Sequence, residues 1–158
     1  MLVISNLCNI PVFALVSVYK PHQLSLRHFY YLMQQKIDSL NITFEYKEPL
    51  VHISFNKAIC IDEKQLLEMI EVRNKLVNHK PHLVLSVFNA VVDFTDEARK
   101  AGADARNSST SIAHAVVVKW LGQRLLTNSY KEIEKPPYPL QIFCDEEQAE
   151  KWLLSHVK

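Results

Sequence analysis

The fold is decided by residues 94–154, which read FTDEARKAGADARNSSTSIAHAVVVKWLGQRLLTNSYKEIEKPPYPLQIFCDEEQAEKWLL. This segment alternates between helical and extended patterns, in the order helix, strand, helix, proline-marked loop, strand, helix. The apolar run at residues 112–118 is typical of a strand that is buried on both faces, as in a parallel sheet. Three prolines in residues 135–139 end the helix predicted for residues 121–133, because proline lacks the backbone N–H and restricts its predecessor. Asp145 is expected to cap the last helix.

The part of the chain before this segment extends the same alternation. Apolar and polar residues alternate on both sides of residues 47–49, which predicts a hairpin over residues 41–55 with its turn at that point. Residues 82–88 form a second apolar run of the buried-strand type. We expect a loop from Asn89 to Phe94, a helix from Thr95 to about Asn107, and a polar loop up to Ser111.

A further helix is predicted to begin at Asp62 and to end before Pro81. Its apolar stripe has helical spacing and consists of Leu66, Leu67, Ile70, Leu76 and Val77. The opposite, solvent-facing side is expected to carry Glu68, Glu71, Arg73 and Lys75.

The predicted order is therefore β-β-α-β-α-β-α-β-α. Strands that alternate with helices imply right-handed crossovers and a mostly parallel sheet flanked by helices, and the opening hairpin adds one antiparallel pair. The length of 158 residues suits one domain with one sizeable core. We therefore predict a single α/β domain over residues 33–158.

Residues 1–32 differ from the rest in being largely apolar up to Tyr19. A secretory signal would need a basic start, but no Lys or Arg precedes Lys20. A membrane span would need about 20 apolar residues, and Asn6, Asn9 and Pro11 interrupt this run. A third interpretation is an N-terminal extension, disordered or not native, before a domain that starts near Met33. An integrated extra element is a further alternative, and all of these stay open.

Composition excludes several classes of function. The chain has two glycines, whereas phosphate-cradling loops, dinucleotide fingerprints and G-x-S-x-G elbows each need closely spaced glycines. A net charge of +1 without a basic stripe argues against nucleic-acid binding. Cys8, Cys60 and Cys144 are widely spaced, which suits a reducing, cytoplasmic location. No Cys/His spacing indicates a metal site, and no cofactor is expected.

Several residues are candidates for a site, and each also has a purely structural interpretation. The Thr95 hydroxyl can cap a helix or accept a phosphate, which a helix N-terminus would stabilise. Arg99 and Arg106 are seven residues apart and would share one face of the predicted helix, either receiving an anionic partner or pairing with Asp96 and Asp104. His114 lies in an apolar strand and is expected to be a hydrogen-bonded core histidine rather than a catalytic base.

Five C-terminal motifs carry a family resemblance, namely T-D-E-A-R, A-V-V-V, L-G-Q-R-L-L-x-N-x-Y, K-P-P-Y-P and F-x-D-E-E-x-A-x-K-W-L. With the order of elements, they resemble the STAS domain and its SEC14-like, SpoIIAA-like relatives, and in particular a small bacterial family of that fold common in Bacteroidetes. The resemblance covers residues 38–158. Sporulation anti-sigma-factor antagonists of this fold carry a phosphorylatable serine in an Asp-Ser-Ser-Gly-type motif. Here that region is residues 89–95, without serine or glycine, and Thr95 is the nearest hydroxyl.

The resemblance implies a non-enzymatic regulatory module that binds a protein partner or a second copy of itself. The expected surface is the loop and helix that carry Asn89, Asp93, Thr95, Arg99 and Arg106. The alternative is a SEC14-like carrier with a small apolar or anionic ligand between sheet and helices. A third alternative is a hydrolase built from dispersed residues. No nucleic acid and no stable membrane span are expected.

Overall fold

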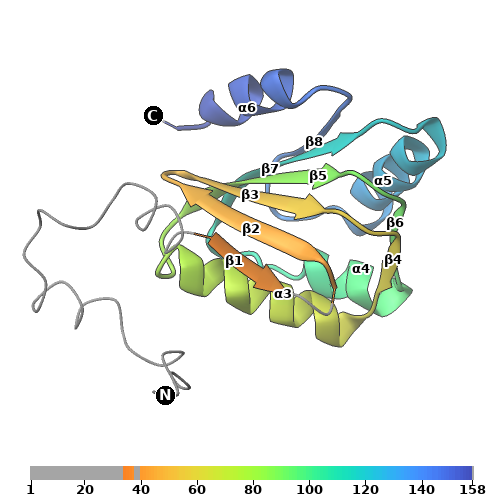
Figure 1. Cartoon of the computed structure of the whole chain (residues 1–158), viewed down its shortest axis with the longest axis horizontal. Coiled ribbons are helices and arrows are strands. Elements are labelled where there is room, and N and C mark those ends of the chain that lie inside the picture. The colour runs from red at the N-terminus through yellow and green to blue at the C-terminus, as the bar shows by residue number, and fades with distance from the viewer. Residues whose placement is uncertain (1–33, 38–39, 158) are drawn as a thin grey trace, which may run out of the picture. The chain divides into compact units, whose positions relative to one another are not determined.

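The computed structural model describes residues 34–37 and 40–157, so the interpretations of residues 1–32 lie outside the described residues. The elements, in chain order, are β1 (Gln34–Ile37), β2 (Ile42–Lys47), β3 (Leu50–Phe55), β4 (Ile59–Ile61), α3 (Glu63–Leu76), β5 (His82–Phe88), β6 (Val92–Phe94), α4 (Asp96–Ala103), β7 (Ser111–Val118), α5 (Leu121–Glu134), β8 (Leu140–Phe143) and α6 (Glu146–Leu154). The predicted α/β class is confirmed (Figure 1).

Six of these strands form one sheet in the order β1-β2-β3-β5-β7-β8. The β2–β3 hairpin is antiparallel, and β1 adds a second antiparallel pair at its outer edge. Strands β3, β5, β7 and β8 run parallel to one another, because a helix connects each of them to the next. The mostly parallel sheet with an antiparallel hairpin is therefore confirmed.

The short strands β1, β4 and β6 were not predicted. The prediction of a continuous loop from Asn89 to Phe94 was wrong, since Val92–Phe94 forms β6, which pairs in parallel with β4 in a separate two-stranded sheet. Strands of three residues are too short to show a periodicity of two, so their pairing is decided by tertiary contacts.

The three helix starts that were predicted from capping residues are confirmed. Asp62, Thr95 and Asp145 each accept a backbone N–H of the first turn through the side chain, from Gln65, Ala98 and Gln148 respectively. These bonds satisfy N–H groups that a helix leaves without partners at its start.

The prediction that the helix after Thr95 runs to about Asn107 was wrong. Helix α4 ends at Ala103, with Asp104 in an extended conformation at its C-cap. The side chains of Asn107 and Ser108 donate instead to the carbonyls of Ala101 and Gly102, which ends the helix early. Arg106 therefore does not share a helix face with Arg99.

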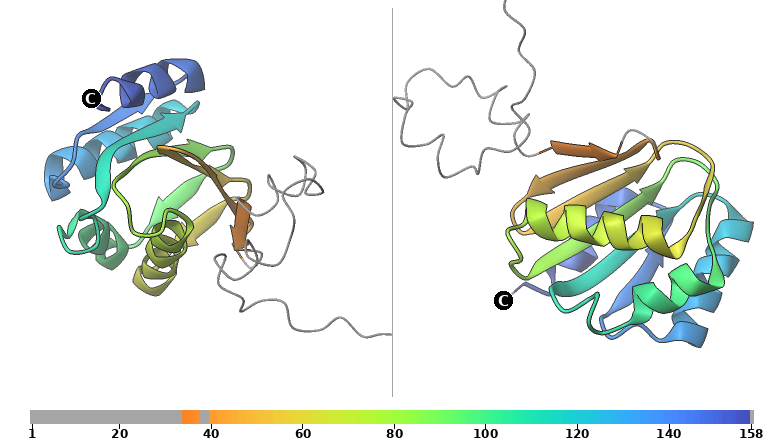
Figure 2. Two further views of the ribbon diagram at one scale, coloured as in Figure 1. Left: turned by 90° about the vertical axis from the view of Figure 1, so that its left-hand side faces the viewer. Right: turned by 90° about the horizontal axis from the view of Figure 1, so that it is seen from below.

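The helices cover the two faces of the sheet unequally. Helices α3 and α4 lie on one face and α6 on the other, with α5 on the α3 side (Figures 1 and 2). Alternation along the strands sorts the side chains accordingly. In β5, Leu83, Leu85 and Val87 pack against α6, whereas Val84 and Phe88 belong to the core under α3.

Candidate functional site

A cavity of about 140 Å³ lies between the sheet and helices α3, α4 and α5. Strands β3, β5 and β7 form its floor, and the three helices and β6 form its walls. Most of its lining is apolar, with Ile53, Phe55, Leu66, Met69, Ile70, Phe88, Val92, Phe94, Val116 and Leu140 among the lining residues. A few polar side chains also reach it, which is typical of a small-molecule site.

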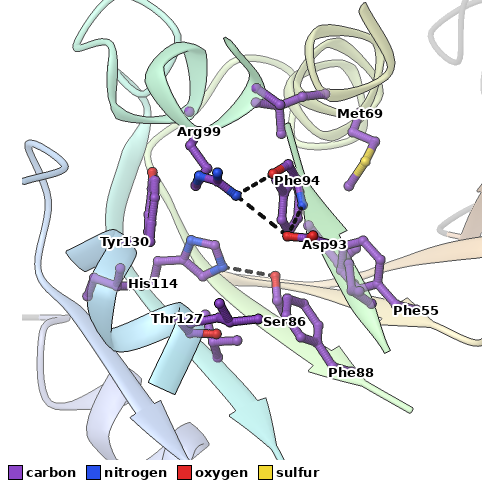
Figure 3. A pocket seen from close by; sticks show the side chains of 18 of the residues that line it. Phe55, Met69, Ser86, Phe88, Asp93, Phe94, Arg99, His114, Thr127 and Tyr130 are labelled. Carbon is purple, nitrogen blue, oxygen red and sulfur yellow. Dashed lines mark hydrogen bonds and ion pairs between the residues drawn. The ribbon is translucent and has the colours of Figure 1, made fainter. Parts of the chain in front are cut away.

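Ser86 on β5 and His114 on β7 meet at the floor of the cavity (Figure 3). The Ser86 hydroxyl and Nε2 of His114 are hydrogen-bonded at 2.9 Å. Both side chains point to the face of the sheet that α3, α4 and α5 cover, because successive residues of a strand alternate between the two faces. His114 is paired with Val84 in the neighbouring strand. The predicted hydrogen-bonded core histidine is confirmed, although part of its surface remains accessible where it lines the cavity.

The environment keeps His114 uncharged. Burial first, and then the positive charge of Arg73 and the neighbouring His82, lower the pKa of His114 from 6.5 to about 3. The pKa of His82 is likewise lowered, to about 4, mainly by burial. At neutral pH both imidazoles are therefore neutral.

Arg73 on α3 also lines the cavity, and its expected place on the solvent-facing side of the helix was wrong. Arg73 is 8% exposed, and its Nε and Nη2 atoms are buried without a hydrogen-bond partner among the described residues. Its position four residues after Met69 and four before Val77 places it on the buried face. The spacing by four residues therefore indicated a buried position, although the charge of arginine suggested an exposed one.

Two tyrosines complete the polar part of the lining. Burial raises the pKa of Tyr138, an effect that its hydroxyl contacts with Tyr130 and Ser108 and the charge of Arg73 partly offset. Burial likewise raises the pKa of Tyr130 well above its usual range. The Tyr130 hydroxyl also approaches α4 closely, since a Cβ at Gly102 would lie 3.2 Å from it. Both phenols are neutral at physiological pH.

Of the five predicted site residues, the structure brings two to the cavity, Asp93 and Arg99. The Arg99 guanidinium donates to the Phe94 carbonyl and to Asp96, and it lies 3.5 Å from the Asp93 carboxylate (Figure 3). Arg99 is therefore already neutralised by carboxylates of this chain. The predicted pairing of Arg99 with Asp96 is confirmed.

The other three residues lie outside the cavity lining. Thr95 is the N-cap of α4, and its role as a phosphate acceptor stays a prediction. Asn89 donates to the side chain of Asn56 on the surface. Arg106 is exposed and pairs with Asp104 at 2.6 Å, as its structural interpretation predicted.

Helix α5 turns three polar residues towards the cavity and several apolar residues towards solvent. Gln123, Thr127 and Tyr130 line the cavity, whereas Leu121, Leu125 and Ile133 are exposed at 69%, 59% and 73%. Leu126 also lines the cavity, although it is 58% exposed.

The part of the chain that the structure describes contains neither a group of side chains that could hold a metal ion nor a helix that could cross a membrane. Within residues 34–37 and 40–157, no group of three or more His, Cys, Asp or Glu side chains is arranged to hold a metal ion. The helices in those same ranges are too short or too polar to cross a bilayer.

The fold has a counterpart among solved structures. The domain is similar to the crystal structure of an uncharacterized protein of the DUF3478 family, with a SpoIIAA-like fold, from Shewanella loihica PV-4. The TM-score is 0.50 at 14% sequence identity, and the match covers 71% of this chain and 91% of that chain. At this identity the likeness shows the fold alone, and it confirms the SpoIIAA-like architecture that the motifs predicted.

The family follows from the sequence. Residues 44–157 match the family model described as "Domain of unknown function (DUF7793)", so the chain belongs to that family. None of the curated proteins matches the chain. The SEC14-like relationship, the bacterial origin and the cytoplasmic location stay predictions.

Proposed function

We propose that this domain binds a small, mainly apolar ligand in the cavity between the sheet and helices α3, α4 and α5. The observation that carries the proposal is the cavity of about 140 Å³ with an apolar lining and a few converging polar groups. An engineered apolar cavity of roughly 150 Å³ accommodates benzene in another protein. A compact ligand of that size therefore fits, and a longer one would extend through the mouth.

The chemistry of the cavity favours binding over catalysis. A serine nucleophile needs a histidine base whose pKa lies near the working pH and whose second nitrogen is oriented by another group. The pKa of His114 is about 3, because burial and the charge of Arg73 oppose its protonation. Ser86 and His114 are thus hydrogen-bonded residues of a binding site, and we assign no catalytic step to them.

Native mass spectrometry of freshly purified full-length protein tests the proposal directly. A co-purifying small molecule that is released on denaturation is the expected result, and a clean unliganded mass would count against the proposal. A titration with two neutral probes, benzyl alcohol and octan-1-ol, followed by amide NMR shifts, then maps the site. The expected shifts lie at cavity-lining residues such as Val116 and Ile70.

Two neighbouring leucines offer a matched pair of variants for the same titration. Leu126 and Leu125 are almost equally exposed, but only Leu126 lines the cavity. Leu126→Trp should narrow the mouth and weaken binding of both probes, whereas Leu125→Trp should bind them like the wild type. Equal effects of the two substitutions would contradict binding at this place.

A second candidate function is protein binding through α5. The exposed residues Leu121, Leu125 and Ile133 recur at intervals of four and eight residues, so they form one apolar stripe. Such a stripe is typical of an interaction surface. We propose a second copy of this chain as its occupant, which sedimentation velocity over a range of concentrations would test. A dimer that the Leu121→Asp, Leu125→Asp double variant dissociates is expected, and a monomer throughout would contradict it.

A further inference from the structure

Among the described residues that line the cavity, only Arg73 has buried polar atoms without a hydrogen-bond partner. More than nine-tenths of its surface is buried, it borders the cavity, and two of its guanidinium nitrogens have no hydrogen-bond partner. Arginine keeps its charge in proteins, since its ordinary pKa is above about 12. A positive charge is thus held beside an apolar cavity.

No counter-ion in the described part of the chain balances this charge. Within residues 40–157 no carboxylate forms an ion pair with Arg73. The groups that sense its charge are His82, His114 and Tyr138, and all three are neutral at physiological pH. A buried charge without compensation is strongly unfavourable, so its presence needs a reason.

Arg99, which lines the same cavity, differs from Arg73 in having hydrogen-bond and ion-pair partners. Arg99 is held by the Phe94 carbonyl and by the carboxylates of Asp93 and Asp96. It has little capacity left for a ligand. In Arg73, Nε and Nη2 have no partner among the described residues. Guanidinium donors match a planar carboxylate in a two-pronged arrangement.

The rest of the cavity sets the size and the charge of the missing partner. One unbalanced positive charge calls for a monoanion, because a dianion would leave one negative charge buried without compensation. The apolar lining and the volume of about 140 Å³ call for a small apolar body attached to that anion.

We propose that the cavity binds a small amphipathic carboxylic acid as its carboxylate, with the carboxylate on the Arg73 guanidinium and the apolar body among the side chains of α3 and the sheet. This inference rests on the proposed ligand-binding function and names the class of its ligand. Aromatic and short aliphatic acids share this chemistry. Phenylacetate represents the aromatic acids, and octanoate represents the aliphatic acids.

The test compares each acid with its neutral amide, using isothermal titration at pH 7.5 with the full-length protein. The pairs are phenylacetate with phenylacetamide, and octanoate with octanamide. We expect at least one acid to bind on the order of tenfold to a hundredfold more tightly than its amide, as for a hydrogen bond to a charged group. Whichever pair shows the preference identifies the aromatic or the aliphatic source.

The Arg73→Met variant should lose this preference and bind the acid and the amide alike. Arg124→Met is the matched control, because Arg124 is exposed on α5 and does not line the cavity. It should keep the wild-type preference. A preference that persists in Arg73→Met would place the anion elsewhere and overturn the inference.

A measurement on the wild-type protein covers the case in which Arg73→Met does not fold. Phenylacetate or octanoate should shift the Nε–Hε NMR resonance of Arg73, and the corresponding amide should not. An unmoved resonance under saturating acid would overturn the inference.

The outcomes separate this inference from the proposed function. Equal binding of acids and amides would overturn the carboxylate assignment and leave the apolar ligand site intact. Absence of binding by all four probes and by the neutral alcohols would overturn both.

Discussion

Gln123 on α5 binds both backbone polar groups of Val92 on β6. The Val92 N–H donates to Oε1 of Gln123 at 3.1 Å, and Nε2 of Gln123 donates to the Val92 carbonyl. A side-chain amide thus takes the place of a neighbouring strand beside β6. Because Gln123 and Val92 both line the cavity, this contact joins two of its walls.

Gln123→Leu should destabilise the fold by about 1–3 kcal/mol, since it leaves the buried N–H and C=O of Val92 without partners. Urea unfolding measures the change. Gln148→Leu on the exposed side of α6 is the control, with an expected effect within about 0.5 kcal/mol. Similar losses in both variants would show that the contact with Val92 contributes little.

Arg73→Met should stabilise the ligand-free protein, by up to about 1–4 kcal/mol, because an apolar side chain removes the cost of an uncompensated buried charge. Thermal and urea unfolding of protein stripped of ligand measure this change. A structural arginine would behave in the opposite way. A marked loss of stability in Arg73→Met would therefore indicate that the guanidinium stabilises the fold, and would contradict a role in ligand binding alone.

Stability should fall as the pH is lowered from about 6.5 towards 4. In the native state the pKa values of His82 and His114 are about 4 and about 3, whereas in the unfolded chain both return to roughly 6.5. The unfolded chain then binds more protons in this window, so acid favours unfolding. We expect the free energy of unfolding to be lower at pH 5.5 than at pH 7.5 by on the order of 2 kcal/mol.

Urea unfolding at several pH values checks this dependence. His82→Gln should reduce the slope of stability against pH, because it removes one of the two buried imidazoles. His79→Gln, at an exposed position, is the control and should keep the wild-type slope. A wild-type stability that does not change between pH 7.5 and 5.5 would contradict the burial of neutral histidines.

Thr95→Val should cost about 1 kcal/mol, since it removes the hydroxyl that accepts the Ala98 N–H at the start of α4. Thr95→Ser keeps that oxygen and should remain close to the wild type. Thermal unfolding compares the two. If the valine variant were as stable as the serine variant, the hydroxyl would not be needed as a cap.

Ser86→Ala should leave any hydrolase activity of the protein unchanged. His114 is too weak a base at a pKa of about 3 to activate the Ser86 hydroxyl at neutral pH. A panel of short-chain ester and phosphoester substrates, run with wild type and variant side by side, checks this expectation. Hydrolysis that disappears in Ser86→Ala would make this pair catalytic and contradict the binding-only interpretation.

Local patterns were sufficient to predict the longer strands and the starts of three helices. Asp62, Thr95 and Asp145 cap helices through short-range bonds to residues three positions away, so their roles could be predicted from neighbouring residues alone. The apolar runs of β5 and β7 indicated a parallel sheet because strands covered on both faces need apolar residues at successive positions.

The candidate site was predicted only in part. Asp93 lies in β6 and Arg99 in α4, and both line the cavity. Arg106 was misplaced because the side chains of Asn107 and Ser108 end α4 early, and nothing in the helical pattern shows which carbonyls they will bind.

The α/β class, the order of most strands and helices, and the caps that begin three helices could be predicted from the amino-acid sequence, because they depend on contacts between near neighbours in the chain. The burial of Arg73 near His114, the bonds between Gln123 and Val92, and the exposure of Leu121 and Leu125 result from tertiary packing. Those arrangements depend on how the helices pack against the sheet. Periodicity shows which residues share a face, but only packing decides what that face meets and whether a cavity is left between them.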